Sequence, residues 1–332
     1  QLGLGELHLE KTMTSPEDTI RIGISACIVG QEVRFNGGHK LDRFIRDTFG
    51  SYVEFIPVCP EVDIGLGVPR ETLRLVRGKS SQPLLIAPKS GAAHTTKMLS
   101  YAKKKATELG KLDLCGFIVQ KGSPSCGMER VKIYPPKDGV APTRNGRGLF
   151  TQVLMEKLPL LPVEEDGRLN DPLLRENFIE RVFSYRRLRK FFSGRWTVGD
   201  LVKFHASEKL LLMAHGSYKS LGQLVARAKG IPRKELKDEY QRLFLTVLSR
   251  RSTSKKHVNV LQHIAGYFRK QLDQDSRDEV HDLIEAYRGG LVPLIVPVTL
   301  MRHHIRHQGI DYLADQTYLS PHPRELMLRN HV

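Results

Sequence analysis

Apolar and polar positions form two alternating patterns in the first half of the chain. Short, almost continuous apolar runs rich in Ile, Val and Phe cover residues 19–27, 52–60 and 114–122, and a shorter run covers residues 83–88. Runs this brief are typical of strands that are buried on both faces of a parallel sheet. Helical patterns that end in a glycine lie between them, at residues 40–50 and 95–110.

This alternation predicts the fold of the first half. Strands that alternate with helices form a doubly wound α/β domain with a mainly parallel, Rossmann-like sheet. Three prolines, an acidic cluster and a glycine between residues 158 and 172 mark a domain boundary. We therefore expect an α/β domain over residues 20–162 and a second domain over residues 175–330.

The second half shows helical periodicity almost throughout and contains no strand-like run. One candidate helix opens with Thr197 and Asp200, which stand at the spacing of a capping box. Another begins at Pro232, a residue suited to the first helical position, and a third has Ser276 three residues before Glu279. The pattern predicts an all-α domain of about six helices.

Positive charge is concentrated in this helical half. The chain has 52 Lys and Arg residues against 36 Asp and Glu residues, a formal net charge of +16. Residues 1–165 carry 23 basic and 18 acidic residues, or +5, whereas residues 166–332 carry 29 and 18, or +11. Such an excess is typical of a module that binds a polyanion. The alternative is a soluble protein that is merely basic.

Several features favour the cytoplasm. No run approaches the roughly 18 apolar residues of a membrane span, and residues 1–19 lack the apolar core of a secretory signal. We leave those residues out of the fold prediction and expect the native chain to start at Met13. Four cysteines without such a signal favour a reducing compartment, where thiols serve metal binding or catalysis more often than disulfides. We expect a cytoplasmic protein with no membrane partner.

Three of the four cysteines follow predicted strands. Cys27, Cys59 and Cys126 lie at or just beyond the carboxyl ends of these strands, and such ends share the sheet edge where ligands bind. Cys115 starts its strand at the opposite edge and is expected to be structural. Three thiolates leave one coordination position open, as in a catalytic metal site, and soft ligands favour iron–sulfur or zinc. The alternative is three unrelated core cysteines.

The residues beside these cysteines are of the types used in acid–base catalysis. Glu61 is two residues from Cys59, and Ser123 and Ser125 lie within three residues of Cys126 in the segment "KGSPSCG". Carboxylates and hydroxyls beside a metal are the groups that general acid–base catalysis uses. The glycines and proline of this segment suit a turn whose backbone approaches a bulky ligand closely.

The segments "SACIVGQEVRFNGGHK", "PVCPEVDIGLGVPRE" and "SPSCG" resemble the three motifs of the thiouracil desulfidase family, TudS. The second half, with "FHASEKLLLMAHG", "VPLIVPVTLMRHH" and "YLADQTYLSPHPRELMLRN", resembles the YbgA-like helical domain that is often fused to it, as in the tRNA 4-thiouridine desulfidases. One departure from the pattern is Asn36, where many relatives carry Asp.

The resemblance implies an iron–sulfur cluster of the 4Fe-4S type, bound by Cys27, Cys59 and Cys126 with one iron left open. It also implies catalytic roles for Glu61 and Ser123 in hydrolytic removal of sulfur from 4-thiouridine in tRNA, with no electron-transfer partner. Alternatives are a desulfidase of free thiouracil and a nonenzymatic nucleic-acid-binding sensor. The basic residues that we expect to contact RNA are Lys121, Arg186, Arg187, Lys190, Arg250, Arg251, Lys255, Lys256, Arg302 and Arg306.

Overall fold

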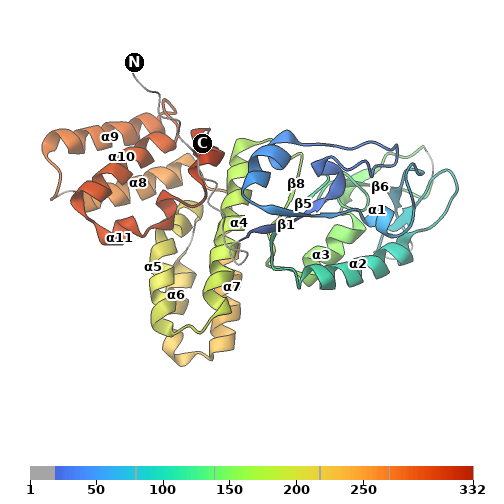
Figure 1. Cartoon of the computed structure of the whole chain (residues 1–332), viewed down its shortest axis with the longest axis horizontal. Coiled ribbons are helices and arrows are strands. Elements are labelled where there is room, and N and C mark those ends of the chain that lie inside the picture. The colour runs from blue at the N-terminus through green and yellow to red at the C-terminus, as the bar shows by residue number, and fades with distance from the viewer. Residues whose placement is uncertain (1–18, 79–80, 138, 217, 269, 332) are drawn as a thin grey trace, which may run out of the picture.

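The computed structural model describes residues 19–78, 81–137, 139–216, 218–268 and 270–331, so the expected start at Met13 lies outside the described residues. The strands and helices of the first half form one part of the molecule, and the helices of the second half form the other (Figure 1). Within the described ranges, none of the helices combines the length and the apolarity needed to cross a membrane.

The main sheet, sheet A, contains the three long apolar runs. Its strands are β1 (Arg21–Ser25), β2 (Glu54–Val58), β5 (Leu114–Val119) and β8 (Val163–Glu165). They follow the order β2-β1-β5-β8, and every pair is parallel. The prediction of a parallel α/β fold is therefore confirmed. The short strand β8, which lies just beyond residue 162, was not predicted.

A second sheet, sheet B, was also not predicted. It contains β3 (Arg74–Val76), β4 (Leu84–Ile86), β6 (Val131–Tyr134) and β7 (Thr143–Gly146), in the order β4-β3-β6-β7. Only β3 and β6 pair in parallel, and the other two pairs are antiparallel. The apolar run at residues 83–88 does form a strand, β4, but that strand joins sheet B. The other three strands of sheet B are only three or four residues long, and the sequence of β7, TRNG, contains no apolar side chain.

Helices cover both faces of sheet A. The first half contains α1 (Pro60–Asp63), α2 (Thr95–Leu109) and α3 (Leu149–Lys157). The apolar faces of α2 and α3 share one core with β5. The predicted helix at 40–50 is instead a π-helical turn, Phe44–Thr48, followed by a 3-10 turn, Phe49–Ser51.

The second half is helical, as predicted, but contains more helices than the six that we expected. Its α-helices are α4 (Pro172–Ser193), α5 (Val198–His215), α6 (Lys219–Ala226), α7 (Arg233–Leu248), α8 (Ser254–Phe268), α9 (Gln274–Arg288), α10 (Ile295–Gln308) and α11 (Asp311–Ala314). The capping box of Thr197 and Asp200 is confirmed at the start of α5. Pro232 precedes the first residue of α7, and the cap of α9 is Asp273, which accepts a hydrogen bond from the Ser276 backbone.

Helix α4 joins the two parts. Its first half packs on sheet A, where Val182 closes on Gly116 of β5 so tightly that a Cβ atom at that glycine would lie 2.8 Å from the valine side chain. Phe178 and Ile179 belong to the same core, whereas Leu188 and Phe192 belong to the core of the helical part. The position of the helical part relative to the sheet therefore depends on α4.

The end of the chain is also tied to α4 by a buried ion network. Arg329 donates to Glu176 at 3.0 Å and to Glu180 at 2.9 Å, and all three side chains are almost fully buried. His215 contacts Glu180 at 2.9 Å through Nε2 and the Arg250 carbonyl oxygen at 2.7 Å through Nδ1. Glu180 is therefore held by both Arg329 and His215.

Candidate active site

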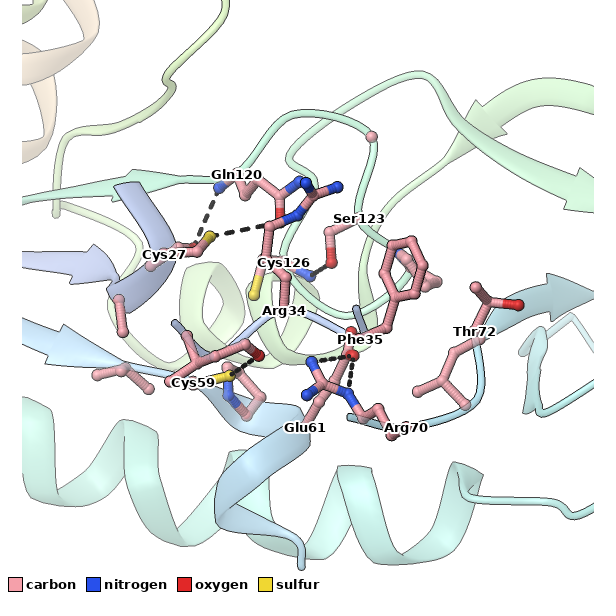
Figure 2. A pocket seen from close by; sticks show the side chains of 18 of the residues that line it. Cys27, Arg34, Phe35, Cys59, Glu61, Arg70, Thr72, Gln120, Ser123 and Cys126 are labelled. Carbon is pink, nitrogen blue, oxygen red and sulfur yellow. Dashed lines mark hydrogen bonds and ion pairs between the residues drawn. The ribbon is translucent and has the colours of Figure 1, made fainter. Parts of the chain in front are cut away.

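The three cysteines that follow predicted strands line one cavity at the carboxyl edge of sheet A (Figure 2). Cys27 lies in the 3-10 turn after β1, Cys59 stands between β2 and α1, and Cys126 follows in the loop after β5. The cavity is open to solvent and has a volume of about 210 Å³. Cys115 is buried at the start of β5 and does not line it.

The thiols of this cavity resist ionisation. Burial, together with the nearby charges of Cys59 and Asp166, raises the pKa of Cys27 to about 11. Burial also raises the pKa of Cys59 and holds that of Cys126 well above its usual range. Since each thiolate charge opposes the others, the three ionise together only around a cation.

The three thiol sulfurs are not gathered closely enough to share a single metal ion. Side chains that share one metal ion place their ligand atoms within 4.8 Å of one another, and the three thiols form no such group in the described part of the chain. The nearby Cys27 and Cys126 thiols still influence each other electrostatically. Three thiolates spread around one open cavity are a donor set suited to an iron–sulfur cluster.

The loop that presents Cys126 is held by hydrogen bonds from its backbone to the Ser123 side chain. The Ser123 hydroxyl oxygen accepts hydrogen bonds from the backbone N–H groups of Ser125, at 3.2 Å, and Cys126, at 3.0 Å. A Cβ atom at Gly127 would lie 2.9 Å from the Ser123 carbonyl oxygen, so the turn requires glycine there. With both lone pairs of Ser123 engaged, its hydroxyl hydrogen is the part left to donate to a ligand.

Glu61 is held in place from two sides. One carboxylate oxygen accepts from the Ser125 hydroxyl at 2.8 Å, and the other accepts from Arg70 Nε at 2.9 Å and Nη2 at 2.8 Å. The Arg70 side chain is only 6% exposed and that of Glu61 15%, so water screens this ion pair weakly. Arg70 therefore stabilises the charged carboxylate and fixes its orientation. Neither Arg70 nor the contact of Ser125 with Glu61 was predicted from the sequence.

Two further residues line the mouth of the cavity. Phe35 is 38% exposed, and the Arg34 guanidinium lies 5.5 Å from the centroid of its ring. Figure 2 shows Phe35 beside Ser123 and above the pair of Glu61 and Arg70. Asn36 does not line the cavity.

The basic residues that we expected to contact RNA differ in their surroundings. Arg187 is engaged inside the helical part, where it donates to Glu208, Ser184 and the Pro321 carbonyl oxygen, so we remove it from the set. Lys256 also donates inward, to the His215 carbonyl oxygen. Lys121 lies at the rim of the thiol cavity, and Arg302 lines a small cavity beside the last residues of the chain. The exposed members are Lys121, Lys190, Arg250, Arg251, Lys255 and Arg306.

A second group of potential metal ligands lies away from the cavity. Ligand atoms of Glu176, Glu180 and His322 come within 4.8 Å of one another in the buried ion network. Arg329 already pairs with both carboxylates, and its guanidinium would repel an added metal ion. We assign no metal to this group.

Comparison with known proteins divides the chain into the same two parts. Residues 22–166 match the model of the 2-thiouracil desulfurase family, and residues 209–323 match DUF1722, which is described as a protein of unknown function.

Individual relatives are each shorter than this chain. YbgA of Escherichia coli K12 is 30% identical over 153 residues, which cover 45% of this chain and 90% of YbgA. YbbK of Bacillus subtilis 168 is 29% identical over 108 residues, which cover 31% of this chain and 71% of YbbK. Among solved structures, the 4Fe-4S-dependent thiouracil desulfidase TudS is 27% identical and covers 46% of this chain and 95% of its own, with a TM-score of 0.37.

Proposed function

Because the chain belongs to the YbgA-like family and joins a 2-thiouracil desulfurase domain to a DUF1722 domain, we propose that it converts 4-thiouridine in tRNA to uridine. The observation that carries this proposal is the meeting of three cysteines, Glu61 and Ser123 in one cavity. The domain limits that we expected, 20–162 and 175–330, form part of the proposal.

The cofactor that we assign is a 4Fe-4S cluster. Cys27, Cys59 and Cys126 would hold it, and Cys115 lies outside the cavity, so one iron would have no cysteine ligand. When bound, this cofactor supplies a thiophilic Lewis acid for the sulfur of the substrate. Its binding would also offset the cost of ionising three buried thiols.

The protein groups then handle the water and its protons. The net reaction exchanges the C=S bond of the base for a C=O bond, consuming water and releasing hydrogen sulfide. Glu61 would accept a proton from the attacking water, a role that contributes on the order of 10²–10⁴ in rate. Ser123 would donate a hydrogen bond to the base as negative charge develops on it. No electron is gained or lost, so the reaction needs no electron-transfer partner.

The charge of the helical half supports RNA as the substrate. A second, wide cavity lies where α4 meets the amino end of β5, and it is lined by Arg186, Arg189, Lys190 and Lys237 against one acid, Asp113. Asp113 pairs with Arg186 and Arg189, so the cavity keeps a net positive charge. A surface of this kind attracts a phosphate backbone.

Free thiouracil is the second candidate substrate, because the matching family model is described as a 2-thiouracil desulfurase. The sensor alternative is weaker. A sensor has no need of a carboxylate oriented by Ser125 and Arg70 in the same cavity as the thiols.

The first experiment is to reconstitute the protein anaerobically and follow the near-ultraviolet thione band of 4-thiouridine in bulk tRNA. Loss of the band with release of sulfide supports the proposal, and an unchanged band in a cluster-loaded sample contradicts it. Parallel reactions with free 4-thiouracil and 2-thiouracil distinguish the second candidate. Turnover of the free bases without turnover of tRNA would favour that candidate.

A further inference from the structure

Gln120 stands at the junction of the two central strands of sheet A. It directly follows β5, and its backbone N–H donates to the hydroxyl of Ser25, the last residue of β1, at 3.1 Å. The side chain lines the thiol cavity beside Cys27 (Figure 2). Its Oε1 atom accepts a hydrogen bond from the Cys27 thiol at 3.6 Å, the side chain's one hydrogen bond to the described residues.

This contact cannot persist if Cys27 binds a metal. A ligating cysteine has lost its thiol proton, so its sulfur becomes an acceptor and would face the Gln120 amide oxygen, a second acceptor. A half-turn of the amide exchanges its oxygen and nitrogen with almost no change of shape. Nε2–H then donates to Cys27 Sγ, and Oε1 turns into the cavity.

We propose that Gln120 is a specificity-determining residue that accepts the N3–H of the substrate pyrimidine through Oε1. This inference rests on the proposed function. N3 is bonded to C4, the carbon that carries the sulfur, so a group that recognises N3 must lie beside the metal ligands, as Gln120 does. Thiolated uracils carry a hydrogen on N3, whereas a cytosine-type ring presents a lone pair that Oε1 would repel.

The mouth of the cavity suits the flat ring that this contact requires. Phe35 offers a partly exposed aromatic face, and Arg34 lies near the same ring. Stacking on an aromatic side chain holds a base without selecting its identity. The choice among bases therefore depends on polar groups at the ring edge, and Gln120 supplies one.

The test compares 4-thiouridine with 3-methyl-4-thiouridine, which lacks the N3–H, in wild type and in Gln120→Leu. We expect the variant to lower kcat/KM for 4-thiouridine about tenfold, as for one lost hydrogen bond, and to change the N3-methyl substrate by less than about twofold. Gln262→Leu, at an exposed position of α8, is the matched control and should leave both values unchanged. An equal loss on both substrates in Gln120→Leu would overturn the assignment.

Two measurements do not depend on turnover. Equilibrium dialysis of the loaded protein should show that wild type prefers uridine to 3-methyluridine and that Gln120→Leu loses this preference. The reduction potential of the cluster should fall in the variant, because an N–H···S hydrogen bond to Cys27 is lost. An unchanged potential together with an unchanged uridine preference would refute both contacts.

Failure of the proposed function remains distinguishable. If wild type turns over neither nucleoside nor 4-thiouridine in bulk tRNA, the desulfidase proposal fails, and the dialysis and the reduction potential still judge Gln120. If Gln120→Leu does not load iron, Gln120→Met, which keeps the chain length, replaces it. If neither variant loads iron, Gln120 holds the cluster and the recognition of N3 is overturned.

Discussion

Replacing Arg329 with methionine tests the buried ion network at the end of the chain. Arg329 contacts Glu176, Glu180 and the Tyr318 carbonyl oxygen, the last at 2.6 Å, and only 4% of its side chain is exposed. The variant keeps a long side chain but leaves Glu176 and Glu180 buried without the arginine that pairs with both. Breaking a buried pair in this way costs about 3–5 kcal/mol of folding free energy.

The folding free energy lost in Arg329→Met should depend on pH. Burial raises the pKa of Glu176 to about 7, and Arg329 acts against that rise. Without Arg329, the folded pKa of this carboxyl lies still further above the unfolded value of 4.5. A group with a raised folded pKa binds more protons when folded, so stability falls as pH rises between the two values. The penalty of Arg329→Met is therefore larger at pH 8 than at pH 5.

Trp196, the one tryptophan of the chain, gives the assay. It is buried in the core of the helical part, so urea unfolding followed by its fluorescence reports on that part. Arg324→Met is the control, since Arg324 is 76% exposed and pairs with its neighbour Glu325. A free energy of unfolding equal to that of wild type at pH 8, or a larger loss at pH 5 than at pH 8, would refute the reasoning.

Three further predictions concern the proposed activity. Cys126→Ala should lose iron and activity together, whereas Cys115→Ala should keep both; an iron-loaded Cys126→Ala protein would remove this residue from the ligand set. Glu61→Gln should keep its iron and lose on the order of 10²–10⁴ in kcat, and full activity would exclude the role as general base. The double variant Lys190→Gln and Lys237→Gln should bind tRNA with a weaker salt dependence. The slope of log association constant against log salt concentration should fall by about 1 for each lysine that contacts a phosphate. Turnover of free 4-thiouracil should not change. The double variant of Lys103 and Lys104, exposed on α2, is its control, and an equal change in both double variants would contradict a role for the second cavity.

The convergence of the cysteines was predictable because strand topology alone determines it. A buried parallel strand is visible as an apolar run, and its carboxyl end is known once its direction is known. Cys27, Cys59 and Cys126 could therefore be brought together without any knowledge of side-chain packing.

The site features that were not predicted depend on contacts between segments that are distant in sequence. Arg70 reaches Glu61 through an irregular loop, and Ser125 is 64 residues from Glu61 in sequence. The segment YRRLRK contains several similar cations, and only the packing of α4 against α5 shows that Arg187 meets Glu208. Sheet B escaped because its strands are too short for periodicity to reveal them.

Helix α4 contributes side chains to the cores of both parts, so it fixes the distance between them. Its 22 residues extend about 33 Å, and within this length Val182 packs on sheet A and Phe192 packs in the helical core. The thiol cavity and the positively charged second cavity lie at opposite edges of sheet A and cannot shift apart freely. A ligand contacts both cavities at once only if it is long enough to span the sheet from one edge to the other.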